Sequence, residues 1–220
     1  MTPVQYDAWY DTPRGQWIGA NEFRRLLAAL QVEAGASVLD AGCGTGYFTR
    51  QLADADLPAT GIDPDAASVE FARSRQAGHE TYLTGDAHTL PFADRHFDHA
   101  IAMTSFCFIE DQAAALRELA RVTRCRVALG LLNRNSLLYL RKGRHGGQGG
   151  YRGAHWHTPA EARRLFQQAG MPNVTLRSAI YLHDGSPFAR LFEHLVPARL
   201  LLGAFLLAVA DVPAVTSTTS

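Results

Sequence analysis

The chain has 220 residues, of which 47% are hydrophobic and 19% charged, and its 21 Lys and Arg residues balance its 21 Asp and Glu residues. A chain of this length can bury the core of one α/β domain, and no second domain is needed. The neutral balance disfavours a nucleic-acid substrate and provides no overall field toward an anionic membrane.

The cysteines and the apolar segments bear on the compartment. Three cysteines occur without C-x-x-C spacing in or beside apolar segments, which indicates reduced packing residues and a cytoplasmic protein. The first residues, with Asp7 and Asp11 among aromatics, lack the charge-then-apolar order of a signal peptide. The longest apolar run, 200–210, is too short to span a bilayer, so we expect a core strand and no stable membrane insertion.

Along the first 132 residues, segments with strand-like and helix-like spacing of apolar residues alternate. Such alternation predicts a parallel sheet with helices on both faces, because parallel strands need a crossover helix between them. The expected elements are a helix at 17–31, a strand at 36–41, a helix at 46–54, a strand at 58–62, a helix at 65–77, strands at 80–84 and 97–103, a helix at 111–123 and a strand at 126–132.

This pattern breaks where a polar, glycine-rich insertion begins, at 133–157. Thr-Pro at 158–159 then supplies an N-cap and a first-turn proline for a helix that should end at Gly170. We expect one domain at 1–215, with an N-terminal helical cap at 1–35. The remaining expected elements are a strand at 173–183, apolar clusters with helical spacing at 187–202, a strand at 204–210 and a disordered tail at 216–220.

A glycine-rich turn is the most specific feature of the chain. An apolar strand stops at Asp40, and Gly42, Gly44 and Gly46 precede a helix. In an open α/β sheet such a turn lets the backbone approach a nucleotide at distances that a Cβ would block. The dinucleotide fingerprint G-x-G-x-x-G would need its last glycine where Tyr47 stands, which disfavours a nicotinamide site. Taken alone, the loop is also compatible with an ordinary tight turn.

Two further expected strands are followed by an acid. Asp63 closes the apolar segment that begins at Ala59, where a carboxylate can bind both ribose hydroxyls. Asp86 follows Gly85 after the next strand. Each acid alone fits a helix cap or a turn, but their order at successive strand ends indicates a nucleotide site.

The sequence Asp-Ala-Gly-Cys-Gly-Thr-Gly at 40–46 resembles the first motif of the class I S-adenosylmethionine-dependent methyltransferases. Asp63, Asp86 and the segment 97–103 resemble the family's second, third and fourth motifs, in order. The resemblance is strongest over 36–132. It implies an α/β fold with a doubly wound, mostly parallel, Rossmann-like sheet of seven strands. The last strand would insert antiparallel between the fifth and sixth, and a lid insertion would follow the fifth.

Both flanks add to the resemblance. The segment 6–15 is similar to the N-terminal segment of bacterial type 11 methyltransferases, the group that includes quinone-biosynthesis-like enzymes, and 116–122 resembles the helix before the fifth strand. One departure is plain, because Thr-Arg-Cys at 123–125 stands where the family commonly has a Pro-Gly turn. That change leaves the cofactor motifs untouched and bears only on the adjoining rim of the active site.

The resemblance implies S-adenosylmethionine as cofactor, S-adenosylhomocysteine as product and no metal. Tyr10 and Trp17 would close the pocket and offer aromatic faces to the sulfonium, although core packing explains both equally well. The other implied cofactor-binding residues are Asp40, Gly42, Cys43, Gly44 and Gly46 on the methionyl side, Asp63 and Pro64 at the ribose, Asp86 and Ala87 at the adenine, and Met103, Thr104 and Phe106 beside the reacting methyl group.

Methyl transfer from a sulfonium is an in-line displacement, so positioning does most of the catalytic work and no generic catalytic motif is expected. Substrate identity should lie in the insertion 133–157, because loops outside the carboxyl ends of the strands form the binding crevice. Its Gly, Arg, Lys and His residues fit either a mobile cationic lid over an acidic or electron-rich substrate, or a solvated loop.

Within the insertion, Tyr151, His155 and His157 are the candidates for catalysis. The two histidines lie two residues apart, so in an extended segment they face the same way and either can serve as general base. A structural hydrogen bond at the helix start is the alternative, and a thiol nucleophile would need no base. No Cys or acid stands beside them at metal-ligand spacing, so we expect no metal.

These observations predict a methyltransferase acting on a small molecule. Two other functions stay open: a non-catalytic or regulatory S-adenosylmethionine-binding module and, less favoured, a nicotinamide-dependent oxidoreductase. The sequence does not indicate the atom that accepts the methyl group or the oligomeric state.

Overall fold

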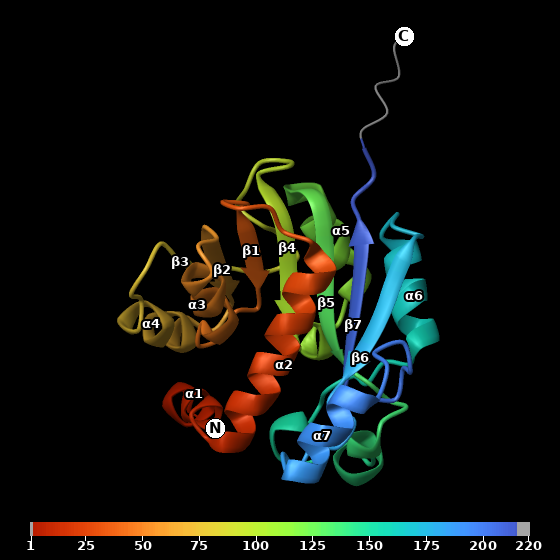
Figure 1. The fold of residues 1–220 in the computed structure, drawn as a ribbon. Helices are drawn as coiled ribbons and strands as arrows, with labels where there is room; N and C mark the ends of the chain where they lie inside the picture. Colours follow the sequence, from red (N-terminus) through yellow and green to blue (C-terminus); the bar gives the residue numbers. More distant parts are fainter. Residues whose placement is uncertain (1, 215–220) are drawn as a thin grey trace.

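A seven-stranded sheet runs through the middle of the computed structural model, which describes residues 2–214 (Figure 1). The strand order is β3-β2-β1-β4-β5-β7-β6, and β7 runs antiparallel to both β5 and β6. This arrangement confirms the expected doubly wound sheet with its last strand inserted between the fifth and sixth. The strands are β1 (Val38–Ala41), β2 (Ala59–Asp63), β3 (Thr81–Thr84), β4 (Phe97–Met103), β5 (Thr123–Leu132), β6 (Val174–Ala179) and β7 (Phe205–Asp211).

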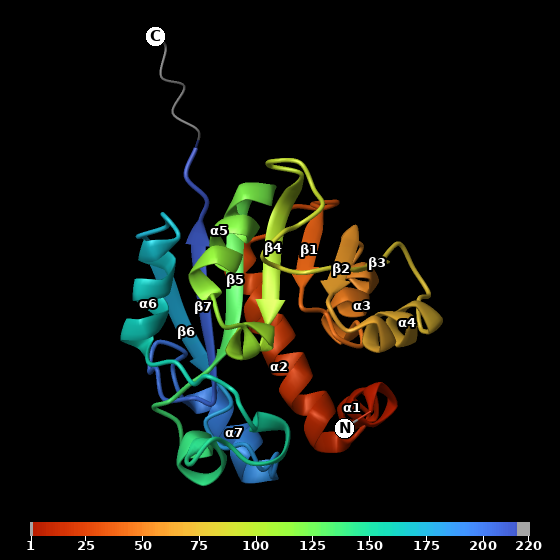
Figure 2. The same ribbon diagram turned by 180° about the vertical axis from the view of Figure 1, so that it is seen from behind.

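Helices cover both faces of the sheet. The long helix α2 crosses the face seen in Figure 1 and contacts β5 and β7, whereas α5 and α6 lie on the opposite face, which Figure 2 brings forward. Both faces are covered because parallel strands are joined by crossover helices, and these helices pack on the two faces of the sheet. The helices are α1 (Pro3–Tyr10), α2 (Pro13–Leu30), α3 (Tyr47–Asp54), α4 (Ala66–Ser74), α5 (Gln112–Val122), α6 (Pro159–Gln168) and α7 (Pro187–Leu195), with short helical turns η1 (Ser105–Phe108), η2 (Tyr139–Gly143) and η3 (Gly149–Tyr151).

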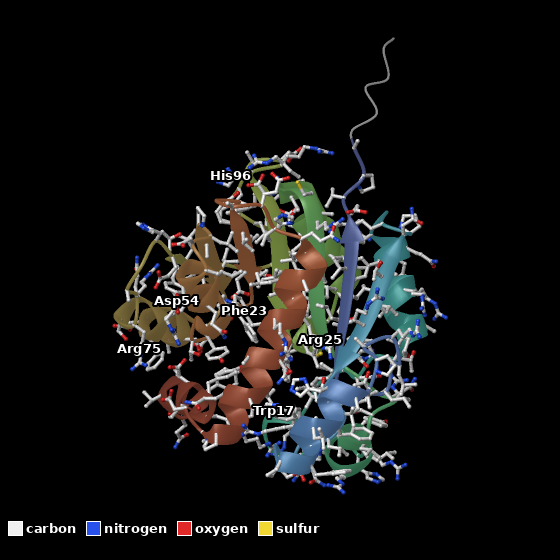
Figure 3. All side chains as sticks on the ribbon, viewed as in Figure 1. Trp17, Phe23, Arg25, Asp54, Arg75 and His96 are labelled. Atoms are coloured by element: carbon white, nitrogen blue, oxygen red, sulfur yellow. The ribbon has the colours of Figure 1, made fainter. Side chains whose placement is uncertain are left out.

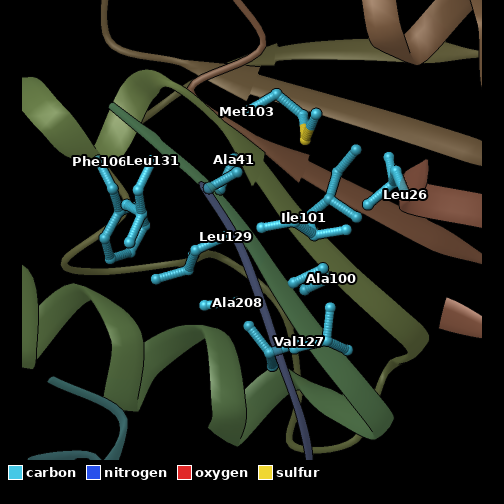
Figure 4. Close-up of a cluster of buried hydrophobic side chains, with 14 of the residues drawn as sticks. Leu26, Ala41, Ala100, Ile101, Met103, Phe106, Val127, Leu129, Leu131 and Ala208 are labelled. Carbon is cyan, nitrogen blue, oxygen red and sulfur yellow. The ribbon is translucent and has the colours of Figure 1, made fainter. Parts of the chain in front are cut away.

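The core is centred where α2 meets the middle of the sheet. Figure 4 shows Leu26 of α2 beside Ile101 of β4, and both side chains are fully buried. On β5, Val127 and Leu129 are also fully buried. Central strands enclosed on both faces need apolar side chains pointing both ways, which explains the continuous apolar runs of β4 and β5.

One strand is shorter than the sequence predicts. The strand expected at 173–183 ends at Ala179. Ile180 then takes a left-handed φ of 63°, and its N–H donates to the carboxylate of Glu193 at 2.9 Å. The chain therefore leaves the sheet, because this donor is no longer available to a neighbouring strand.

The C-terminal region also differs in one boundary. The helical segment expected at 187–202 ends at Leu195, shortly before Pro197, which has no N–H to continue a helix. The apolar run at 200–210 supplies most of β7, as expected. The tail predicted at 216–220 lies outside the described residues. Within residues 2–214, no helix is both long enough and apolar enough to cross a bilayer.

The insertion 133–157 has a small core of its own. Trp156 is 3% exposed, and its ring centroid lies 5.4 Å from those of both Tyr139 and Tyr151. The buried side-chain amide of Asn133 donates to the carbonyl of Gly203 at 2.7 Å, which fixes the start of the insertion to the strand entering β7. These contacts anchor the segment at the carboxyl edge of the sheet. Its role as a lid and its status as a separate part of the domain stay predictions.

Candidate cofactor site

A cavity of about 440 Å³ opens at the carboxyl ends of β1, β2 and β4, within the usual size range of small-molecule pockets. It lies where the strand order reverses direction between β1 and β4, the place at which open α/β sheets bind ligands. Its lining residues come from α1 and its N-cap, the ends of β1, β2 and β4, the loops after β1 to β4, the starts of α3 and α4, and η1. They are Thr2, Pro3, Tyr6, Tyr10, Asp40, Gly42, Cys43, Gly44, Thr45, Tyr47, Phe48, Asp63, Pro64, Asp65, Ser68, Asp86, Ala87, Met103, Thr104, Ser105, Phe108 and Ile109.

The glycine turn between β1 and α3 forms one wall. Gly44 has a φ of 52°, and a Cβ there would meet no protein atom within 4 Å, so its backbone borders open space in the cavity. Gly46 has a φ of 77°, and a Cβ there would lie 2.7 Å from the ring of Tyr82. Gly44 therefore leaves room for a ligand, whereas Gly46 is required by the packing against Tyr82.

Asp40 is a buried acid with one free oxygen. Its Oδ2 accepts a 2.7 Å hydrogen bond from the Thr49 hydroxyl, whereas Oδ1 is buried without a partner. Burial raises the pKa of Asp40 to about 7, although the Thr49 hydrogen bond acts in the opposite direction. An unpaired buried carboxylate oxygen calls for a donor, and a ligand ammonium would supply one.

Asp63 is tied to the backbone on both oxygens. Oδ2 accepts from the N–H of Gly44 at 2.8 Å, and Oδ1 accepts from the N–H of Asp65 at 2.9 Å. Burial raises its pKa, and these two hydrogen bonds lower it. Each oxygen keeps acceptor capacity, so the side chain is positioned for a pair of hydroxyl groups.

Asp86 is held differently. Its side chain is exposed, and Oδ1 accepts from the backbone N–H of His88 at 2.9 Å and contacts the His88 ring nitrogen Nδ1 at 2.7 Å. The hydrogen bonds from His88 lower the pKa of Asp86. Next to it, the buried Ala87 and the neighbouring Ile109 give the cavity an apolar wall that suits an aromatic base.

Thr104 marks the end of β4 with an unusual backbone. Its φ is 62°, a left-handed value that β-branched residues rarely adopt. Its N–H donates to the carbonyl of Gly130 at 2.8 Å, which holds this conformation in place. Such outliers concentrate at functional sites, and this one lies in the cavity wall beside Met103.

Aromatic side chains cover the cavity from the N-terminal side. Tyr10 stacks on Tyr47 with ring centroids 3.5 Å apart, and the hydroxyls of Tyr6 and Tyr10 lie 3.5 Å apart. An ion pair of 2.8 Å between Asp7 and Arg50 fastens α1 to α3. Tyr6 and Tyr47 were not among the predicted site residues. The i, i+4 repeat of Tyr6 and Tyr10 was an available signal, because it places both rings on one helix face.

Most predicted cofactor residues line the cavity, and three do not. Trp17, which Figure 3 labels on α2, lies instead under the guanidinium of Arg190 of α7, 5.9 Å from the ring centroid. Phe106 is fully buried in the core, and Gly46 faces Tyr82. Those in the lining are Tyr10, Asp40, Gly42, Cys43, Gly44, Asp63, Pro64, Asp86, Ala87, Met103 and Thr104.

None of the three predicted catalytic residues lines this cavity. His155 and His157 border a second cavity of about 320 Å³ between α5 and α6. His157 is 1% exposed, its Nε2 contacts Gln112 Oε1 at 2.8 Å, and burial lowers its pKa to about 4. Tyr151 packs on Trp156 within the insertion. The geometry gives His157 a packing role, and catalytic roles for the three residues stay predictions.

The sequence analysis also did not predict that Glu22 is buried. This acid lies on α2 outside the cavity lining and is 8% exposed, and within the described range 2–214 its side chain makes no hydrogen bond or ion pair. Burial raises its pKa to about 8. Its position between Ile18 and Leu26, one helical turn from each, was an available signal, because that stripe is otherwise apolar.

The fold is the one seen in solved S-adenosylmethionine-dependent methyltransferases. Residues 39–128 match the family model described as a methyltransferase domain. The resemblance seen in the motifs is thereby confirmed. Among residues 2–214, no group of three or more His, Cys, Asp or Glu side chains is arranged to hold a metal ion.

Curated relatives share the motif-bearing part of the chain. An uncharacterized protein of Mycobacterium tuberculosis is 35% identical over 188 residues, which cover 82% of this chain and 62% of that protein. A malonyl-[acyl-carrier protein] O-methyltransferase of Pectobacterium atrosepticum is 39% identical over 100 residues, which cover 46% of this chain and 39% of that enzyme. The chain therefore spans less than two thirds of the length of either relative.

Solved structures share the whole fold at low identity. A Thermotoga maritima protein, described as an S-adenosylmethionine-dependent methyltransferase and possible histamine N-methyltransferase, superposes with a TM-score of 0.70 at 21% identity, covering 96% of this chain and 95% of that one. Magnesium protoporphyrin IX methyltransferase of Synechocystis, solved with bound S-adenosylhomocysteine, gives 0.63 at 19% identity, covering 90% and 84%. At these identities the likeness shows the fold.

Proposed function

We propose that this protein transfers a methyl group from S-adenosylmethionine to a small-molecule acceptor by in-line displacement, releasing S-adenosylhomocysteine. The observation that carries the proposal is the unpaired Asp40 Oδ1, which is buried beside the glycine turn in the cavity wall. A site that keeps such an acceptor free is suited to a ligand with a donor, and the amino group of the methionyl part is one.

The rest of the cavity fits the same molecule. Asp63 would accept hydrogen bonds from the two ribose hydroxyls, because the backbone already fixes both of its oxygens. Ala87 and Ile109 would contact the adenine, with Asp86 at the rim. When bound, the cofactor would supply an electrophilic methyl group on a positively charged sulfur. The chain's task would then be to orient it and to exclude water.

The acceptor would enter beside the end of β4. Met103 and Thr104 line the cavity there, and Phe108 and Ile109 follow in η1 and the residue after it. Curated relatives include enzymes named as O-methyltransferases, which supports a small or carrier-bound acceptor. The insertion 133–157 would act as a lid, since Asn133 and Trp156 anchor it at this edge.

We further propose a cytoplasmic location, which rests on the cysteines. Cys43 and Cys107 are buried free thiols, and burial raises the pKa of Cys107 to about 12. Protonated, buried thiols of this kind suit a reducing compartment.

Calorimetric titration with S-adenosylmethionine tests the cofactor assignment. The wild-type protein should bind it with micromolar affinity, and Asp63→Ala should weaken binding by about tenfold or more, the equivalent of one lost charge-assisted hydrogen bond. Asp54→Ala, an exposed acid at the end of α3, is the matched control and should bind like wild type. Binding of NADH instead, or no binding, would exclude the methyltransferase function. Binding without release of S-adenosylhomocysteine from any acceptor would favour the non-catalytic module.

A further inference from the structure

The helix α7 exposes its apolar side chains and buries an acid, the reverse of what a surface helix usually does. Phe188, Leu191 and Leu195 follow one another at spacings of three and four residues, which places them on one face of the helix. That face points outward, because the three side chains are 65%, 58% and 72% exposed. Glu193, on another face of the same helix, is only 2% exposed.

Hydrogen bonds and an ion pair hold α7 in this orientation. One carboxylate oxygen of Glu193 accepts from the backbone N–H groups of Ile180 and Tyr181 at 2.9 and 3.1 Å. The other oxygen pairs with Arg25 of α2 at 3.3 Å. One turn away, Arg190 donates to the first backbone carbonyl of α2 at 3.0 Å. Turning the apolar face inward would break these bonds and leave buried polar groups without partners, so the outward position belongs to the fold.

The apolar face of α7 is part of a larger exposed patch. Two leucines of the loop after α7 and two of the insertion 133–157 are also exposed. Figures 1 and 2 both show α7 between the green and the teal turns of that insertion, so these segments lie side by side. They hold seven of the eleven large apolar side chains that are exposed within residues 2–214. We call these seven the α7 patch: Leu137, Leu140, Phe188, Leu191, Leu195, Leu200 and Leu202.

The insertion beside α7 is cationic. It contains five of the chain's 21 Lys and Arg residues and none of its 21 Asp and Glu residues, so the remainder of the chain has an excess of acids. Four of the five cations are exposed and make no ion pair within residues 2–214: Arg141, Lys142, Arg144 and Arg152.

These cations adjoin the apolar side chains of the α7 patch. Two of them directly follow Leu140. Arg199, which is also exposed and has no ion pair in the described part of the chain, directly precedes Leu200. The exposed acid beside α7 is Asp184, whose carboxylate already accepts hydrogen bonds from the residue that caps the start of the helix. The α7 patch is therefore an apolar surface with a positively charged border.

An exposed apolar patch of this extent marks a surface that binds another molecule or a membrane. A helix that lies on a bilayer buries Phe and Leu side chains at the edge of the acyl region and places Arg and Lys among the headgroups, where anionic lipids attract them. A second copy of this chain fits less well, because a two-fold contact would bring two cationic borders together. Nucleic acid would pair with the cations and leave the apolar side chains in water.

We propose that the α7 patch binds the surface of a bilayer that contains anionic lipids, with the apolar side chains entering the acyl region and the bordering cations at the lipid phosphates. The inference does not depend on the proposed function. The attachment is peripheral, because α7 has 9 residues and a membrane-spanning helix needs about 20. β5 and β6 lead into the patch at the carboxyl edge of the sheet, the edge at which the cofactor cavity opens. The bilayer would therefore lie against this edge.

Co-sedimentation of the full chain with lipid vesicles tests the proposal. One set of vesicles contains phosphatidylcholine and phosphatidylglycerol in equal parts, and the other contains phosphatidylcholine alone. Wild type should partition into the anionic vesicles about tenfold or more above the neutral ones, because several cations face the headgroups. Added salt should reduce this difference, since it screens charges at the membrane surface.

Two double variants separate the apolar from the cationic contribution. Leu191→Gln/Leu195→Gln should lose about tenfold or more in partition into anionic vesicles, because two leucines no longer enter the acyl region. Arg141→Gln/Lys142→Gln should lose about tenfold or more with anionic vesicles and nothing with neutral ones. Urea unfolding establishes that each variant is folded, and the second pair lies on an exposed turn outside the core.

Matched controls make the same substitutions outside the α7 patch. Leu83→Gln replaces an exposed leucine of β3, and Arg75→Gln/Arg163→Gln removes two exposed cations that have no ion pair in the range 2–214. Both controls should bind vesicles like wild type.

Each contrary result overturns a defined part of the proposal. No binding of wild type to either kind of vesicle would reject the membrane. Equal binding to neutral and anionic vesicles, unchanged by salt, would reject the role of anionic lipid. Wild-type partition in both double variants would remove the α7 patch from the contact. Sedimentation velocity distinguishes the remaining occupant: a wild-type dimer that Leu191→Gln/Leu195→Gln converts to a monomer, without vesicle binding, would assign the patch to a second copy of the chain.

Discussion

The hydroxyl of Thr49 donates a 2.7 Å hydrogen bond to Oδ2 of Asp40 and leaves Oδ1 of the same carboxylate buried without a partner. Thr49 comes from the first turn of α3 and Asp40 from β1, so the glycine turn between them brings the pair together. The bond favours the charged form of an acid whose pKa burial raises to about 7. Thr49 thereby supports the negative charge that the proposed ligand ammonium needs.

Replacement of Thr49 should make cofactor binding depend more steeply on pH. In Thr49→Val the pKa of Asp40 rises further, because the group stabilising its charged form is gone. A smaller fraction of Asp40 is then ionised at pH 7, and S-adenosylmethionine binding should weaken by roughly three- to tenfold there, as expected for one hydrogen bond to a charged group. The affinity should recover toward pH 9. Titration calorimetry across this pH range measures the affinity, with Thr60→Val on β2 as the control. A loss of affinity in Thr49→Val that does not change with pH would mean that Thr49 acts only through packing.

Glu22 should lower stability in alkaline solution. Its folded pKa is raised from about 4.5 to about 8, so the folded state binds its proton more tightly than the unfolded state does. Stability therefore falls as pH rises from about 4.5 to about 8, by about 4 kcal/mol at 1.36 kcal/mol per pKa unit. Glu22→Gln should be as stable as wild type near pH 4 and more stable at pH 8.5. Urea unfolding at both pH values measures this, and parallel pH profiles would contradict it.

His157 should produce the opposite dependence in acid. Burial lowers its folded pKa to about 4, so the unfolded state gains a proton first as the pH falls. The contribution of neutral His157 to the free energy of unfolding is intact above about pH 6.5, the usual pKa of histidine. About 3 kcal/mol of it is lost as the pH falls toward 4. His157→Gln should flatten that part of the profile, whereas the exposed His79→Gln should leave it unchanged. Identical acid profiles for His157→Gln and wild type would contradict the assignment.

Gly46 and Gly35 offer a matched pair for the glycine turn. Both have a positive φ, 77° and 73°, but a Cβ would meet the Tyr82 ring at Gly46 and nothing at Gly35. Gly35→Ala should cost roughly 1 kcal/mol for the left-handed backbone alone. Gly46→Ala should cost roughly 2–4 kcal/mol, because overpacking adds to that strain. Equal losses in denaturant unfolding would mean that Tyr82 moves aside without cost.

The sequence was informative wherever a site is built from residues close together along the chain. The acid and glycines at 40–46 follow a strand and open a helix, so their spacing indicated the turn, and the family resemblance implied its ligand. Asp63 and Asp86 were predictable at the same edge because parallel strands place their carboxyl ends together. The antiparallel last strand came from the family resemblance, and β7 has that place in the sheet.

Tertiary packing decided the rest, because the exposure of a side chain depends on which elements cover it. Glu22 is buried because α2 turns that face toward the core, and Trp17 lies outside the cavity because it packs under Arg190. His155 and His157 were expected near the cofactor, but the path of the insertion places them between α5 and α6. The sequence by itself determined the fold class and the cofactor motifs, which rest on short-range spacing, whereas only the three-dimensional packing decided which acids are buried and which aromatics enclose the cavity.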